Sequence, residues 1–126
     1  MNYLGLDYGD KNVGVAIARE GVMALGFKIL GNDGNLIPTI KSIAKSESVD
    51  VIVVGLQVNV DGTESKQTQK TKDFINELKK ELPEVRIENG DEKMSTLEAA
   101  RNLPNRRQKK DAEAARIILQ GYLDIS

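Results

Sequence analysis

Neither cysteine nor histidine occurs in this sequence of 126 residues. The two absences exclude disulfide bonds, zinc sites of the cysteine and histidine type, thiol nucleophiles, and every base or triad that relies on an imidazole. Metal ligation and proton transfer must therefore come from carboxylates, lysine, tyrosine, hydroxyl groups or a metal-bound water. Oxygen ligands of this kind suit Mg²⁺ or Mn²⁺.

Long apolar runs are also missing. The longest spans Val51–Leu56, whereas a membrane helix needs roughly 20 apolar residues. The first residues include Asp7, Asp10 and Lys11, which a signal peptide would not carry. We therefore expect a cytoplasmic protein that has no contact with a membrane, and the lack of cysteine agrees with that location.

Charge is unevenly distributed along the chain. The net charge is −1, which argues against a uniformly basic coat for nucleic acid, yet residues 101–110 carry five basic side chains and no acidic one. This segment either guides a nucleic acid or is an ordinary solvated loop. The three tyrosines and two phenylalanines all lie outside it, which argues against a platform for stacking bases.

Apolar periodicity predicts the order of elements in one domain that spans residues 1–126. Strands are expected at about 3–8, 12–19, 22–30, 50–55 and 85–88, and helices at about 35–47, 64–80, from Ser95 onward, and 108–123. Short turns join the first three strands, as in an antiparallel meander. The β-branched run at 50–55 is typical of a strand buried on both faces, so we expect it to be central and parallel to the first. This order predicts an α/β fold with a mixed sheet covered by helices.

Two stretches show no apolar pattern. Glu64–Lys72, the first half of the second helix, has no apolar face, so it either projects and moves or is an exposed helix end. Residues 89–94 are predicted to form a turn, because they precede the capping-box pattern Ser95–Glu98 that starts another helix.

Three acidic residues stand out by their positions. Asp7 interrupts the first apolar strand, where a charge is unfavourable unless it has a use; Glu92 follows the last strand, and Asp111 lies at the edge of the apolar stripe of the last helix. Open α/β sheets place their sites at such strand ends. A divalent cation would relieve the repulsion among three carboxylates. Taken singly, each acid has an ordinary alternative role: bonding turn amides, lying in an exposed turn, or compensating a helix dipole.

Several motifs together resemble the YqgF family of Holliday junction resolvases and pre-16S rRNA nucleases, whose fold is RNase H-like. They are Leu4–Gly9 with Val13–Ile17, Asp50–Leu56 with Asp61–Thr63, Asp91–Thr96, and Lys110–Leu123. The resemblance covers nearly the whole chain. It implies a mixed five-stranded sheet, made of an antiparallel meander plus two parallel strands and flanked by helices. It also implies a catalytic site in which Asp7, Glu92 and Asp111 hold Mg²⁺ or Mn²⁺.

We also expect a set of basic residues and backbone amides to hold the substrate. The basic side chains that would contact phosphates are Lys11, Lys93, Arg106, Arg107, Lys109 and Lys110, together with backbone amides near Gly9 and Asp10. Two positions depart from the family pattern. Gln57 replaces a usual proline, and Lys93 replaces a usual arginine, which keeps the charge but loses the bidentate fork.

The hypothesis that follows is metal-dependent phosphodiester hydrolysis, directed at the 5′ end of precursor 16S rRNA. One alternative is a resolvase that acts on four-way DNA as a dimer, and another is a non-catalytic factor bound to RNA or ribosomes. The expected partners are precursor rRNA or branched DNA and ribosomal particles, with the chain a monomer or a homodimer. An actin-like or sugar-kinase ATPase is excluded, because such proteins close two lobes over a nucleotide and this length provides one.

Overall fold

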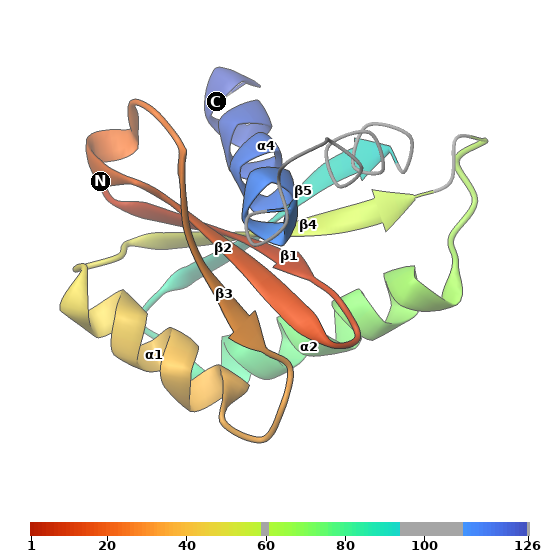
Figure 1. Cartoon of the computed structure of the whole chain (residues 1–126), viewed down its shortest axis with the longest axis horizontal. Helices are drawn as coiled ribbons and strands as arrows, with labels where there is room; N and C mark the ends of the chain where they lie inside the picture. Colours follow the sequence, from red (N-terminus) through yellow and green to blue (C-terminus); the bar gives the residue numbers. More distant parts are fainter. Residues whose placement is uncertain (59–60, 94–109, 126) are drawn as a thin grey trace.

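One mixed sheet organises the molecule (Figure 1). The computed structural model describes residues 1–58, 61–93 and 110–125, and for residues 58, 91–93, 110 and 111 it describes the backbone alone. Within these ranges the strands are β1 (Tyr3–Tyr8), β2 (Asn12–Ala18), β3 (Leu25–Gly31), β4 (Val51–Val58) and β5 (Arg86–Lys93). Their order across the sheet is β3-β2-β1-β4-β5. The sheet is therefore centred on the first strand of the chain.

Strand directions agree with the sequence pattern. The pairs β1–β2 and β2–β3 are antiparallel, which confirms the meander, and the pairs β1–β4 and β4–β5 are parallel. Strand β4 lies between β1 and β5, so it is an interior strand parallel to the first. This arrangement is the predicted mixed five-stranded sheet.

Helices cover both faces of the sheet (Figure 1). They are α1 (Leu36–Ser46), α2 (Lys66–Glu81) and α4 (Lys110–Ile125), and a short 3₁₀ turn, η1 (Arg19–Gly21), precedes β3. Helices α1 and α2 lie on one face and α4 lies on the other. No helix in the described part of the chain is both long and apolar enough to span a membrane.

Large aliphatic side chains fill the face under α1 and α2. Leu4 and Leu6 of β1 and Ile52 and Val54 of β4 alternate onto this face, where they join Ile40, Ile43, Phe74 and Leu78 from the two helices. Side chains two residues apart in a strand share a face, so this cluster uses the even positions of both strands. This face holds the larger hydrophobic core.

Small residues dominate the opposite face, which we call the α4 face. Ala16, Ala18, Ala114 and Ala115 belong to its cluster. Gly5 is needed there, because a Cβ at that position would lie 2.6 Å from Leu119 Cβ. A Cβ on Gly55 would overlap Ile118 Cδ1. Glycine and alanine thus allow α4 to pack directly against the strand backbones.

Two predictions for the helix α2 and the strand β5 were wrong. The first half of α2 does have a buried side, because Thr68 and Thr71 are fully buried there, and Thr68 forms a capping box with Ser65. Strand β5 does not stop at residue 88 but continues to Lys93, since β4 is long enough to pair with it throughout. The predicted turn is therefore strand at residues 89–93. The helix predicted from Ser95 lies outside the described residues.

The remaining boundaries differ by a few residues. Strand β3 begins at Leu25 rather than near residue 22, because η1 and a bend occupy the preceding positions. Helix α4 is observed from Lys110 to Ile125 and was predicted at 108–123. These shifts leave the order and type of the described elements as predicted.

Candidate active site

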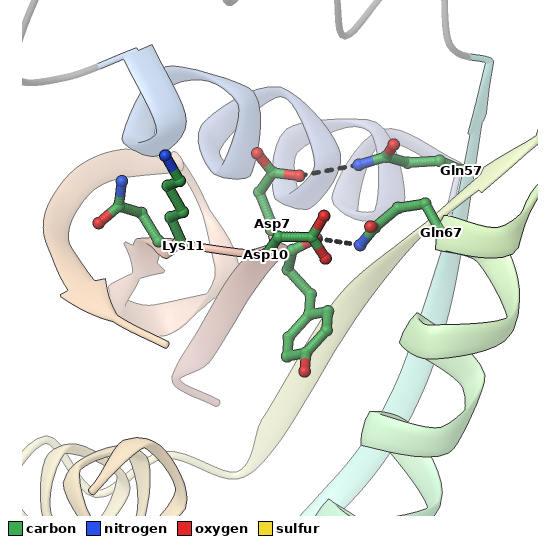
Figure 2. A pocket seen from close by; sticks show the side chains of 8 residues that line it. Asp7, Asp10, Lys11, Gln57 and Gln67 are labelled. Atoms are coloured by element: carbon green, nitrogen blue, oxygen red, sulfur yellow. Dashed lines mark hydrogen bonds between the residues drawn. The ribbon is translucent and has the colours of Figure 1, made fainter. Parts of the chain in front are cut away.

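Asp7 lies near the carboxyl end of β1 and is buried, with 2% of its surface exposed. It shares a face with Gly5, which is two residues earlier and packs on α4. The Gln57 amide donates a hydrogen bond from Nε2 to Asp7 Oδ1 at 3.1 Å, and Figure 2 shows the two side chains pointing toward each other. The sequence prediction that Asp7 is a carboxylate set into the interior is confirmed.

The turn between β1 and β2 is held by its own backbone and by one neighbour. Gly9 donates its N–H to the Asn12 carbonyl at 3.0 Å, and Asn32 donates its N–H to the Lys11 carbonyl at 2.9 Å. The Asn32 side chain also donates to the Gly9 carbonyl at 2.7 Å. Because the Gly9 amide is used inside the turn, the predicted phosphate contact from this amide has no support.

Helix α2 forms a second wall beside this turn. Gln67 donates from Nε2 to the Tyr8 carbonyl at 3.0 Å, and Lys70 Nζ pairs with Asp10 Oδ1 at 3.1 Å. The β1–β2 turn and the start of α2 line an open pocket of about 290 Å³ (Figure 2). The pocket is lined by Asp7, Tyr8, Gly9, Asp10, Lys11, Asn12, Gln57 and Gln67.

The backbone brings Glu92 toward the same edge of the sheet. In the parallel pairing of β4 with β5, Glu92 lies opposite Gln57. Gly5 is paired with Val53, so alternation places positions 7, 57 and 92 on the α4 face. The sequence placed Glu92 in a turn, and the structure places its backbone in β5 instead.

Asp111 belongs to the first turn of α4. The next residue, Ala112, packs toward Gly26 of β3 on the α4 face, and a Cβ on Gly26 would lie 3.4 Å from Ala112 Cβ. The start of α4 therefore lies over the sheet. The side chains of Glu92 and Asp111 lie outside the described residues, and among the side chains that are described no three acids are grouped to hold a metal.

The predicted basic residues are distributed unevenly with respect to the pocket. Lys11 is exposed and lines it. Lys93 ends β5 and Lys110 begins α4, with only their backbones described. Arg106, Arg107 and Lys109 lie outside the described residues. Of the six basic residues predicted to contact the substrate, Lys11 is the one whose side chain is described, and it lies at the pocket.

Sequence reasoning missed the part that two glutamines play in this pocket. Gln57 was noted as a departure from a family pattern, and Gln67 was not considered. Both follow from long-range contacts, since their partners are 50 and 59 residues away in sequence. The one local signal was Gln57 itself, a polar residue that directly extends an apolar interior strand.

The motif Asp61–Thr63 forms a local turn after β4. Asp61 Oδ1 accepts hydrogen bonds from the Thr63 hydroxyl at 2.7 Å and from the Thr63 N–H at 3.0 Å. The hydroxyl and then the amide lower the pKa of the Asp61 carboxyl from its ordinary value. Gly62 has a φ of +88°, which favours glycine at this position. The motif therefore fixes the shape of the loop.

Before any comparison, the architecture defines an α/β protein with a mixed five-stranded sheet, a buried carboxylate near the end of its middle strand, and a helix packed on the face that carries this carboxylate. Solved structures of the same fold include *T. thermophilus* RuvC in complex with a Holliday junction substrate, with a TM-score of 0.61 and 11% identity over 100% of this chain and 96% of that one. The fowlpox virus resolvase in complex with Holliday junction DNA has a TM-score of 0.58 and 12% identity, over 99% and 98%. The fold is RNase H-like.

Sequence comparison then gives the family. Residues 1–125 match the family described as "RuvX: Holliday junction resolvase". A *Clostridium tetani* protein named "Putative pre-16S rRNA nuclease" is 42% identical over 98% of this chain and 96% of its own length. A *Halothermothrix orenii* protein of the same name is 38% identical over 98% and 95%. The chain belongs to the RuvX family, a family of nucleases, as the resemblance to YqgF proteins implied.

Proposed function

We propose that this chain is a single-domain, divalent-metal-dependent nuclease that matures the 5′ end of precursor 16S rRNA in the cytoplasm. Asp7, Glu92 and Asp111 are its proposed catalytic residues and metal ligands. The observation that carries the proposal is the buried Asp7 at the end of the middle strand, with position 92 on the same face and the first turn of α4 packed over that face. The names of the curated relatives support the choice of substrate.

The donor chemistry fits a hard cation. The chain has no histidine or cysteine, and the three proposed ligands are all carboxylates, which suit Mg²⁺ or Mn²⁺. Burial of Asp7 is unfavourable for a charged group, and a cation would offset that cost. When bound, such ions supply Lewis-acid chemistry, which activates the attacking water and stabilises the leaving oxygen.

The chain's own residues bind and orient the nucleic acid in this proposal. Lys11 lies at the pocket rim, where its ammonium group attracts a phosphate, and the Lys70–Asp10 pair holds the neighbouring turn against α2. Lys93, Arg106, Arg107, Lys109 and Lys110 are proposed to guide the strand toward the pocket. Contacts of this type recognise the phosphate backbone and carry no sequence information, so selection of the cleavage point would come from RNA shape or from bound ribosomal particles.

Cleavage of a Holliday junction is the second candidate function. It is favoured by the description of the matching family and by the shared fold of two resolvases solved with junction DNA. Resolution of a four-way junction requires two sites in a symmetric dimer, whereas trimming of one RNA strand does not. The substrate and the oligomeric state therefore separate the two functions.

The test compares wild-type protein with Asp7→Asn on end-labelled precursor 16S rRNA leader, single-stranded RNA and four-way DNA, with Mg²⁺ or Mn²⁺. We expect Asp7→Asn to lower the cleavage rate by more than about 100-fold, because loss of a ligand exceeds the 10–100-fold effect of losing its outer-shell partner. Asp73→Asn is the matched control, since it removes the same charge from an exposed site on α2 and should cut like wild type.

Each outcome has a distinct meaning. Cleavage of the leader alone supports RNA maturation, and cleavage of the junction by a dimer supports resolution. If wild-type protein cuts none of the three substrates, and wild type and Asp7→Asn bind RNA or ribosomal particles equally well, the nuclease proposal is wrong and the chain is a binding factor.

A further inference from the structure

The Gln57 side chain is buried in direct contact with the Asp7 carboxylate. It is 3% exposed and donates from Nε2 to Asp7 Oδ1 at 3.1 Å, with the two residues coming from adjacent parallel strands. A buried amide that bonds a buried carboxylate has few other ways to satisfy its donors, so the contact is directional and persistent. The hydrogen bond therefore restricts the orientation of the carboxylate.

Gln57 is itself held in place from α2. The backbone carbonyl of Gln57 accepts a hydrogen bond from the hydroxyl of Thr68, which is fully buried. The same hydroxyl accepts the Ser65 N–H at 3.1 Å, and the Ser65 side chain accepts the Thr68 N–H at 3.2 Å. A chain of hydrogen bonds thus runs from the capped start of α2 through Gln57 to Asp7.

The place of Gln57 in the sheet adds a second argument. Strand β4 lies between β1 and β5, and Gln57 is the residue opposite Glu92. A neutral amide therefore occupies the strand between two acidic positions on the same face. It provides a donor to one carboxylate without adding a negative charge of its own, as glutamate would at this position.

We propose that Gln57 is a positioning residue that fixes the Asp7 carboxylate for binding a divalent cation. A carboxylate has about four lone-pair directions, and the hydrogen bond from Gln57 occupies only one of them, which is compatible with metal ligation by the same group. The inference rests on the proposed metal site. It assigns a role to Gln57, which is not one of the proposed metal ligands. Partners that orient a metal ligand in this way are worth about 10–100-fold in metal affinity or activity.

The test measures Mn²⁺ binding by the loss of the free-ion signal in electron paramagnetic resonance, and cleavage as a function of Mn²⁺ concentration. Gln57→Leu removes the donor with little change in volume, and Gln57→Met, unbranched like glutamine, serves as a second variant if leucine prevents folding. We expect both to raise the Mn²⁺ dissociation constant and the Mn²⁺ concentration for half-maximal cleavage by about 10–100-fold. Saturating Mn²⁺ should restore much of the rate, which a damaged fold would not allow.

Gln69→Leu is the matched control, because Gln69 also donates to an aspartate, Asp73 Oδ1 at 3.1 Å, but on the exposed side of α2. It should leave Mn²⁺ binding unchanged. If wild type and Gln57→Leu bind Mn²⁺ equally, or if wild type binds none, the positioning role is overturned. If wild type binds Mn²⁺ more tightly than the variant and neither cuts any nucleic acid, the positioning role stands and the nuclease proposal fails.

Discussion

The two faces of the sheet are packed by opposite means. Under α1 and α2, strands contribute leucine, isoleucine and valine, so that face is stabilised by the amount of apolar surface it buries. On the α4 face, glycine and alanine predominate, and what matters there is the short distance between helix and strands. The difference teaches that the face that carries Asp7 is built for close approach, whereas the other supplies most of the hydrophobic stabilisation.

The largest expected effect on stability comes from removing side-chain atoms on the sheet face under α1 and α2. Ile52→Ala should lower the free energy of unfolding by about 2–5 kcal/mol, because Ile52 is fully buried and its removal leaves a cavity under α1 and α2. Denaturant unfolding measures this change. Val22→Ala, at a side chain that is 73% exposed, should change the value by less than about 0.5 kcal/mol. Equal losses at the two positions would refute the stated role of this face.

The α4 face should instead be sensitive to added atoms. Gly55→Ala is expected to destabilise the protein by about 1–3 kcal/mol, since the new Cβ would overlap the Ile118 side chain. Gly34→Ala is the control, because no heavy atom lies within 4 Å of a Cβ at that position. It should be near neutral in the same unfolding experiment.

A double-mutant cycle then tests the cause of the Gly55 effect. Ile118→Ala removes the atoms that the new Cβ would meet, so Gly55→Ala with Ile118→Ala should be less destabilised than the sum of the two single variants. Strict additivity would mean that the space between β4 and α4 is not what limits this position.

The smallest expected effect concerns a polar link that holds α4 to the edge of the sheet. Gln120 Oε1 accepts the N–H of buried Ala24 at 3.0 Å. Gln120→Ala should therefore lower stability by about 1 kcal/mol and speed hydrogen exchange of the Ala24 amide. Asp124→Ala removes a different hydrogen bond of Gln120, from Nε2 to Asp124 Oδ1 at 3.0 Å, and should leave Ala24 protected. Unchanged exchange in Gln120→Ala would show that the link is not maintained in solution.

Periodicity was enough to predict most of the fold, and its failures have physical reasons. Residues 89–94 were predicted to form a turn because they precede the capping-box pattern at Ser95. In the structure Gly90 is in β5, where a Cβ would lie 3.1 Å from Val53 Cγ1 and 3.4 Å from Ile118 Cγ2. The glycine therefore serves the close approach of α4, a tertiary requirement that local sequence does not reveal.

The buried side of α2 was missed for a different reason. Thr68 and Thr71 count as polar in any apolar pattern, yet both are fully buried. Each hydroxyl donates to a backbone carbonyl, Thr68 to Gln57 and Thr71 to Gln67, so burial leaves no unpaired donor. Threonine with a satisfied hydroxyl behaves here as a small hydrophobic residue.

The candidate site was predictable only in part. Asp7 could be found because a charge inside an apolar strand is unfavourable, and the structure confirms its burial. The contacts that Gln57 and Gln67 make could not, because each depends on strands and helices distant in sequence coming together. The roles of Glu92 and Asp111 stay predictions, supported by the positions of their backbones.

The strand order has a consequence for how the protein is made. Strand β1 is synthesised first and becomes the middle strand, but its second neighbour, β4, begins only at Val51. The emerging meander therefore carries an open β1 edge until β4 has left the ribosome, and an open edge can pair with a strand of any other chain. Parallel pairing between distant segments is slow. During translation, therefore, the β1 edge is open to pairing with other chains until β4 covers it.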